Sequence, residues 1–134
     1  MKEIPIAIRV RRKEVQNLKT MNKVSMTLCK KLKRIGYKNI SYNHHKDPHS
    51  YRGTKYHIHL IGYINKESVE GLMEYLNKYI HGNSEWLPDY SSYKCYELSG
   101  KYGEVAVSGF TDDKHIRTYY TYMEKDMGVN RIYI

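Results

Sequence analysis

The sequence lacks the features of a membrane protein and of a disulfide-stabilised secreted domain. No apolar run reaches the ~20 residues of a membrane-spanning helix, and the first residues lack the apolar core of a signal peptide. The two cysteines, Cys29 and Cys95, stand alone without Cys-x-x-Cys spacing. A disulfide framework is therefore not expected, and Cys29, on the apolar face of a predicted helix, is expected to be a buried free thiol. We expect no membrane partner and a reducing, cytoplasmic location.

Acidic residues are scarce in the first third of the chain. Residues 1–46 hold 13 lysines and arginines but only Glu3 and Glu14, whereas residues 47–134 hold 10 basic and 12 acidic residues. The net charge of +9 therefore comes entirely from the first third. A basic region on a near-neutral body is typical of proteins that bind a polyanion. A solvated helix face would have the same composition.

The chain also lacks repeats, linkers and low-complexity runs. Its 134 residues suffice for one hydrophobic core, so residues 1–134 are predicted to form a single domain. Phenylalanine and tryptophan occur once each, whereas there are 15 tyrosines. These tyrosines could stack on nucleic acid bases or pack as ordinary half-buried strand residues.

Hydrophobic periodicity predicts an alternation of strands and helices. Apolar residues at alternate positions predict strands at 4–12, 39–45 and 54–64, and a hairpin at 93–98 and 104–110. Helical spacing predicts helices at 15–35, after a cap at Asn65, and after a cap at Thr111 or Asp112. The second helix should bury a stripe formed by Val69, Leu72, Met73, Leu76 and Ile80. The third should bury one formed by Ile116, Tyr120, Met123 and Met127.

This order of elements predicts the fold class. We expect an α+β fold with a single antiparallel sheet of about five strands and helices packed on it. The long, apolar strand at 54–64 should lie near its centre.

The most informative motif is His57-Ile58-His59, within that central strand. Because strand side chains alternate between faces, the two imidazoles should project together while Ile58 and Leu60 point into the core. Imidazole is the commonest metal ligand, so the pair would form half of a metal site. The alternative is a pair of partly exposed histidines on a solvated face.

A catalytic metal site would need a third ligand, and the second predicted strand with its loop offers two main candidates. Asp47 would add a hard oxygen and favour Mg²⁺ or Mn²⁺. His45 would complete an all-imidazole set that also binds Mn²⁺ or other transition ions. The sequence leaves both open. A closed zinc site that combines Cys95 with the histidines is a further alternative, but no ligand spacing supports it.

Tyr122 and Lys125 form a candidate nucleophile and its cationic partner. They lie one turn apart on the third predicted helix, where Tyr122 occupies the shoulder of the apolar stripe. Attack of a phenol on phosphorus needs positive charge or a metal nearby, and Lys125 would contribute that charge. The same Tyr-x-x-Lys spacing occurs at Tyr63 and Tyr75. The alternative for Tyr122 is an aromatic side chain that simply packs on the sheet.

Together these motifs resemble those of HUH-superfamily endonucleases of the rolling-circle replication initiator (Rep) type, in their small viral or plasmid form. The His-apolar-His motif of that family matches His57-Ile58-His59, and its tyrosine motif matches Tyr119 followed by Tyr122-Met123-Glu124-Lys125. The order of elements agrees over nearly the whole chain, without the Gly-x-x-x-x-Gly-Lys loop of a fused helicase. The resemblance implies a ferredoxin- or RRM-like fold and favours Tyr122 over the other two tyrosines.

The resemblance also implies an activity: nicking and rejoining of single-stranded DNA at a replication origin. His57 and His59, with Asp47 or His45, would hold one Mn²⁺ or Mg²⁺ ion on the scissile phosphate. Tyr122 would attack that phosphate, leaving a 5′-phosphotyrosine and a free 3′-hydroxyl, and Lys125 would stabilise the charge. A basic set would contact the DNA backbone, namely Arg9, Arg11, Arg12, Lys19 and Lys23. By analogy the protein would be a homodimer.

Three other functions remain open from the sequence. One is a single-tyrosine transposase or relaxase of the same superfamily. Another is a non-catalytic nucleic-acid-binding module that uses its tyrosines to stack bases. The third is a structural zinc-binding regulator.

Overall fold

The structure, a computed structural model, describes residues 2–12, 17–47, 55–80, 94–100, 103–110, 112–125 and 128–134. Its elements in chain order are β1 (Glu3–Arg12), α1 (Leu18–Arg34), β2 (Lys38–Lys46), β3 (Tyr56–Asn65), the short 3-10 helix η2 (Lys66–Ser68), α2 (Val69–Ile80), β4 (Lys94–Gly100), β5 (Gly103–Gly109), α3 (Asp113–Met123) and β6 (Arg131–Ile132). Within these residues, no helix is both long and apolar enough to span a membrane.

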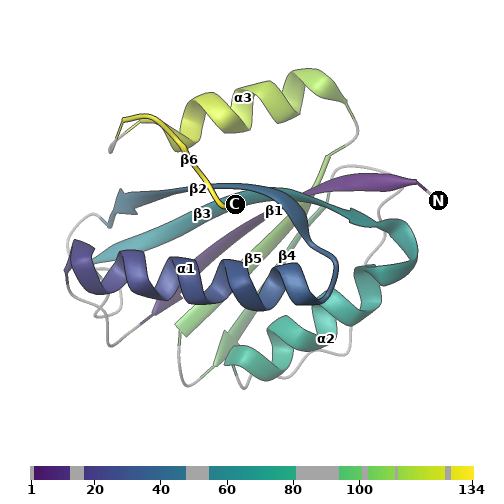
Figure 1. The fold of residues 1–134 in the computed structure, drawn as a ribbon, viewed down its shortest axis with the longest axis horizontal. Coiled ribbons are helices and arrows are strands. Elements are labelled where there is room, and N and C mark those ends of the chain that lie inside the picture. The colour runs from purple at the N-terminus through teal and green to yellow at the C-terminus, as the bar shows by residue number, and fades with distance from the viewer. Residues whose placement is uncertain are drawn as a thin grey trace.

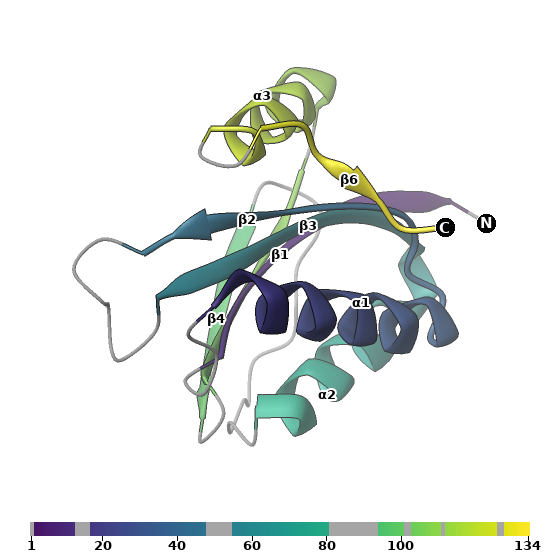
Figure 2. The ribbon, with the colours of Figure 1, turned by 60° about the vertical axis from the view of Figure 1, so that its left-hand side comes forward.

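The strands form one antiparallel sheet in the order β4-β5-β1-β3-β2-β6. The α+β class and the central position of β3 are confirmed, and the arrangement is ferredoxin-like. Helices α1 and α2 cover one face of the sheet, and α3 lies over the other (Figures 1 and 2). The sixth strand was not predicted. It is a two-residue pairing in which Ile132 and Arg131 lie opposite Ser41 and Tyr42 of β2.

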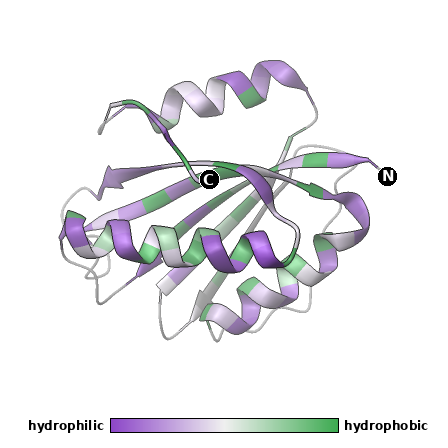
Figure 3. Ribbon diagram, in the orientation of Figure 1, coloured by the Kyte–Doolittle hydropathy of each residue, from purple (hydrophilic) through white to green (hydrophobic). Residues whose placement is uncertain are grey.

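The hydrophobic core lies between the sheet and the helices α1 and α2. Hydrophobic residues recur along both helices with hydrophilic residues between them (Figure 3). The predicted stripe of α2 is confirmed, since all of its members are buried: Val69, Leu72, Met73, Leu76 and Ile80. Cys29 of α1 is a free, fully buried thiol as predicted, and burial raises its pKa to about 12.

A close contact beside the core fixes how α1 connects to the sheet. Gly36 follows the helix with a positive φ of 99°, and Tyr37 then turns inward and is fully buried. Its hydroxyl donates a hydrogen bond to the carbonyl of Ile6 at 2.7 Å. The Tyr37 ring passes so close to Gly62 of β3 that a Cβ there would lie 2.7 Å from it. Only glycine at position 62 leaves room for this aromatic ring.

Helix α3 packs more loosely than predicted. Its cap is Asp112, whose side chain accepts a hydrogen bond from the backbone N–H of His115 at 2.9 Å. Of the predicted stripe only Met123 is fully buried, while Ile116 and Tyr120 are half-buried. The last stripe position, Met127, lies outside the described residues, as does Thr111, the alternative cap. The stripe prediction is therefore confirmed at Met123 and only in part at Ile116 and Tyr120, because α3 faces a polar surface of the sheet.

The C-terminal segment joins α3 to β2 through side-chain amides. The Nδ2 atom of Asn43 donates to the carbonyl of Gly128 at 2.9 Å and to Oδ1 of Asn130 at 3.0 Å. Asn130 in turn donates to the carbonyl of Tyr120 at 3.0 Å. These contacts hold the end of α3 close to β2.

Candidate metal centre

Polar residues of the neighbouring strands β1, β3 and β2 lie on the sheet face that is turned away from α1 and α2. His57 of β3 lies directly opposite His45 of β2 on one side and Arg11 of β1 on the other, and His59 lies opposite Arg9. Directly opposed residues project from the same face of a sheet. This face therefore carries the histidine pair.

The alternation predicted from the His-Ile-His motif is confirmed on the other face. Ile58 and Leu60, which alternate with the two histidines along β3, are fully buried in the core.

The imidazoles of His45, His57 and His59 form a cluster that can hold a metal ion. One nitrogen from each lies within 4.8 Å of the others, and Nε2 of His57 lies 3.0 Å from Nε2 of His59. Two nitrogens that bind one tetrahedral ion, each at about 2.1 Å, would be about 3.4 Å apart, so a small adjustment of the two rings would admit an ion. All three residues are buried. This burial contradicts the alternative of an exposed pair on a solvated face.

Burial also keeps two of these imidazoles neutral. It lowers the pKa of His57 to about 4, although the Asp47 carboxylate acts in the opposite direction. It lowers the pKa of His59 to about 2, with a further contribution from the neighbouring His57 and His45 rings. A neutral imidazole keeps the lone pair that binds a metal. His57 and His59 are therefore neutral, and able to bind a metal ion, at neutral pH and at pH values well below it.

Asp47 contacts the cluster through Nδ1 of His57. Its Oδ1 atom accepts a hydrogen bond from Nδ1 of His57 at 2.6 Å, whereas Nε2 of the same ring faces His59. The same oxygen accepts from Nε of Arg11 at 3.1 Å, and the Asp47 side chain is fully buried. A carboxylate in this position orients an imidazole and directs its other nitrogen toward a metal. Of the two candidates for the third ligand, His45 is grouped with the pair and Asp47 orients His57.

The other two histidines are held by α3. Nε2 of His45 donates to the backbone carbonyl of Met123 at 3.0 Å. Nδ1 of His59 is hydrogen-bonded to the hydroxyl of Tyr119 at 2.9 Å. The sequence analysis matched Tyr119 to the tyrosine motif but did not predict it as a site residue. The available signal was its spacing, because it lies one turn before Tyr122 on the same side of the helix.

Tyr122 reaches the cluster, as its position on the predicted helix suggested. Its ring centroid lies 5.0 Å from that of His45 and 5.4 Å from that of His59, yet the residue remains 47% exposed. The Nζ atom of Lys125 lies 6.0 Å from the centroid of the Tyr122 ring. Tyr75, by contrast, lies on α2 at the opposite face of the sheet, stacked on Tyr79. Among the described rings with this Tyr-x-x-Lys spacing, Tyr122 is the one that contacts the histidines.

The five predicted DNA-binding residues do not form one surface. Arg9 and Arg11 lie on the face of the histidines, where Arg9 pairs with Glu97 at 3.2 Å. Arg12 turns to the helix side and donates to the hydroxyl of Tyr79 at 2.7 Å. The last two, Lys19 and Lys23, are exposed on α1.

The proposed zinc ligand Cys95 lies on β4, and its side chain is outside the part that the structure describes. Within the described residues, the grouped ligands are the three histidines alone.

Comparisons of the chain with protein-family models, with curated protein sequences and with solved structures found no match. The resemblance to HUH endonucleases therefore stays a prediction from the sequence motifs.

Proposed function

We propose that the chain is a metal-dependent DNA endonuclease and strand transferase that nicks single-stranded DNA through Tyr122. The observation that carries the proposal is the contact of the exposed Tyr122 ring with His45 and His59, at 5.0 and 5.4 Å. A potential nucleophile thus stands at the open edge of a cluster that can hold a metal. The net charge of +9 supports a polyanionic substrate.

The donor set fits a divalent ion with open coordination positions. Three protein ligands are typical of catalytic sites, whereas closed structural zinc sites use four. Magnesium prefers oxygen ligands and imidazole suits transition ions, so three histidines favour Mn²⁺ over Mg²⁺. When bound, such an ion would polarise the oxygens of a phosphodiester.

The protein residues then have separate roles. The Oη atom of Tyr122 attacks phosphorus, the bond from phosphorus to the 3′ oxygen breaks, and the phenol proton passes through solvent to that oxygen. The products are a 5′-phosphotyrosine and a free 3′-hydroxyl. Lys125 stabilises negative charge at the phosphate. Because the covalent link keeps the energy of the broken bond, attack by a 3′-hydroxyl rejoins the strand without ATP.

The biological role that we propose for this activity is the start of replication at an origin of a small virus or plasmid in the host cytoplasm. It rests on the order of the motifs, including Lys125 three residues after Tyr122. Cleavage of replication origins but not of hairpin transposon ends would separate this role from that of a transposase.

The test is formation of a covalent adduct. The protein is incubated with Mn²⁺ and a pool of labelled single-stranded origin oligonucleotides and then resolved on a denaturing gel. We expect an adduct that EDTA prevents and that Tyr122→Phe abolishes. Tyr75→Phe is the matched control, because it removes a hydroxyl at the same Tyr-x-x-Lys spacing on the other side of the sheet.

Two results would count against the proposal. An adduct that persists in Tyr122→Phe but is lost in Tyr75→Phe would show that the nucleophile is wrong. Binding that ignores EDTA, with no adduct on any oligonucleotide, would favour a non-catalytic nucleic-acid-binding module.

A further inference from the structure

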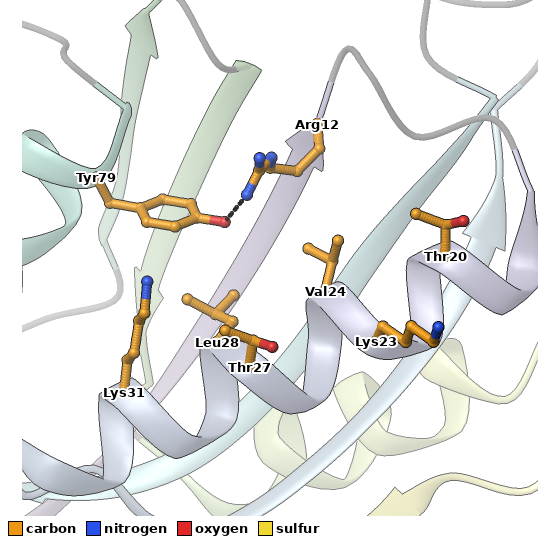
Figure 4. Close-up of a pocket in the computed structure, with 8 residues that line it drawn as sticks. All are labelled: Arg12, Thr20, Lys23, Val24, Thr27, Leu28, Lys31 and Tyr79. Carbon is orange, nitrogen blue, oxygen red and sulfur yellow. Dashed lines mark hydrogen bonds between the residues drawn. The ribbon is translucent and has the colours of Figure 1, made fainter.

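A basic pocket opens on the side of the sheet opposite to the histidines. It has a volume of about 170 Å³ and lies where the end of β1 meets α1 and α2 (Figure 4). Its lining residues come from these three elements: Arg12, Thr20, Lys23, Val24, Thr27, Leu28, Lys31 and Tyr79. It shares no lining residue with the histidine cluster.

The pocket gathers positive charge around one aromatic ring. Nη1 of Arg12 donates to the hydroxyl of Tyr79 at 2.7 Å, and the Arg12 guanidinium carbon lies 5.5 Å from the ring centroid. The Nζ atom of Lys31 lies 6.0 Å from the same centroid. Arg12 at the hydroxyl end and Lys31 beside the ring therefore bring two cations to one rim of the pocket (Figure 4). Lys23 adds a third cation farther along α1.

Among the described residues that line the pocket, every charged side chain is a cation. Its described lining contains neither Asp nor Glu, and the whole of α1 (Leu18–Arg34) lacks an acidic residue. Cations gathered in this way repel one another, and an anion bound among them would relieve the repulsion. The hydroxyls of Thr20 and Thr27 provide further donors beside them.

We propose that this pocket binds a phosphate group of a nucleic acid strand, as a second contact separate from the metal centre. Phosphate presents several charged acceptor oxygens, which match a lining of cations and hydroxyls. The apolar floor formed by Val24 and Leu28 would face the adjoining sugar. The proposal takes its nucleic acid partner from the proposed function, but it needs neither the metal nor Tyr122.

The alternation of β1 connects this pocket to the metal centre. Arg11 contacts Asp47, which orients His57, whereas the next residue, Arg12, lines the pocket on the other face. Both sites therefore adjoin the same end of β1. A strand held at the metal centre would pass around that end to place a flanking phosphate in the pocket.

The test measures binding without cleavage. Fluorescence anisotropy follows a labelled single-stranded oligonucleotide in EDTA at several salt concentrations. The test variant is Lys23→Gln/Lys31→Gln. The matched control is Lys30→Gln/Lys33→Gln, which removes two charges from exposed positions of the same helix that do not line the pocket.

We expect the pocket variant to bind about tenfold more weakly, since it loses charged hydrogen bonds to one phosphate. The slope of log K against log salt should fall by about 0.7, the value for release of one phosphate's counterion from a single strand. The control pair should change the affinity by a smaller factor and leave the slope within error of the unmodified protein.

Equal losses in the two variants would overturn the proposal, because they would show that α1 acts only through its overall charge. The proposal would also be overturned if inorganic phosphate or a mononucleotide protected the pocket lysines from acetylation but the oligonucleotide did not, because the pocket would then bind phosphate but not a nucleic acid strand. Failure of the proposed function would look different, because it would appear as a missing adduct with Mn²⁺. The salt slope in EDTA does not depend on that reaction.

Discussion

Substitution of Asp47 tests whether this carboxylate orients a ligand or is itself a ligand. In Asp47→Asn the side chain keeps its shape, and its amide oxygen can still accept from Nδ1 of His57, now 2.6 Å from Oδ1. The substitution removes the negative charge that makes this hydrogen bond strong and that pairs with Arg11 at 3.1 Å. Nε2 of His57, which faces His59, would remain available to a metal ion.

The expected magnitudes separate the two roles. Loss of a group that orients a ligand weakens metal binding by about 10- to 100-fold. Loss of a ligand costs more, since about 10–16 kcal/mol for a four-ligand zinc site corresponds to about 3 kcal/mol per ligand. That figure is a loss of more than about 100-fold in affinity. We therefore expect Asp47→Asn to bind Mn²⁺ about tenfold more weakly and His45→Ala at least 100-fold more weakly.

Isothermal titration calorimetry with Mn²⁺ at pH 7.5 provides the measurement. Asp113→Asn is the control, because it removes an exposed carboxylate from α3. Thermal unfolding of each variant without metal checks that the fold survives, since Asp47 and Arg11 form a pair that is largely buried. The reasoning is refuted if His45→Ala binds Mn²⁺ as well as the unmodified protein while Asp47→Asn loses all measurable affinity.

Further predictions concern the packing, the thiol and the response to pH. Gly62→Ala should lower the free energy of unfolding by about 1–3 kcal/mol, because its methyl group would lie 2.7 Å from the buried Tyr37 ring; an unchanged urea midpoint would contradict this packing. In a Cys95→Ser variant, Cys29 should react with a disulfide reagent at pH 8 only after unfolding, since it is fully buried with a pKa of about 12; rapid reaction of the native protein would show that the thiol is accessible. The pKa of His59 is about 2 in the fold and about 6.5 when unfolded, so the unfolded chain takes up this proton first and stability is lost as the pH falls below 6.5. The metal-free protein in EDTA should lose up to about 1.4 kcal/mol per pH unit from this group between pH 6 and 4, and a flat profile of urea midpoints would argue against a buried neutral imidazole.

Local periodicity was enough to predict most of the fold and the location of the histidines. Apolar alternation in β1 and β3 determined which residues enter the core, so the shared face of His57 and His59 followed from their spacing alone. The strand β6 was missed because a two-residue pairing leaves no periodic pattern.

The third ligand was a harder problem for a physical reason. His45 and Asp47 are two residues apart around the end of β2, so alternation assigns them to the same face. Only the register of the sheet distinguishes them, since it places His45 directly opposite His57. The ion pairs of Arg9 and Arg11 could not be predicted from the sequence either. Their partners come from distant parts of the chain, namely Glu97 on β4 and Asp47 directly after β2.

The opposite orientations of Arg11 and Arg12 also affect how this protein tolerates change. Substitutions at either position act on one side of the sheet, so the contact of Arg11 with Asp47 and the contact of Arg12 with Tyr79 could be changed independently in design or in evolution. An insertion or deletion of a single residue in β1 would have a different effect. It would reverse the faces of both arginines at once: an insertion would put Val10 in the place of Arg11 and leave Asp47 without its cation, whereas a deletion would put Arg12 there and Val10 opposite His59. Length changes should therefore be far rarer in this strand than amino-acid replacements.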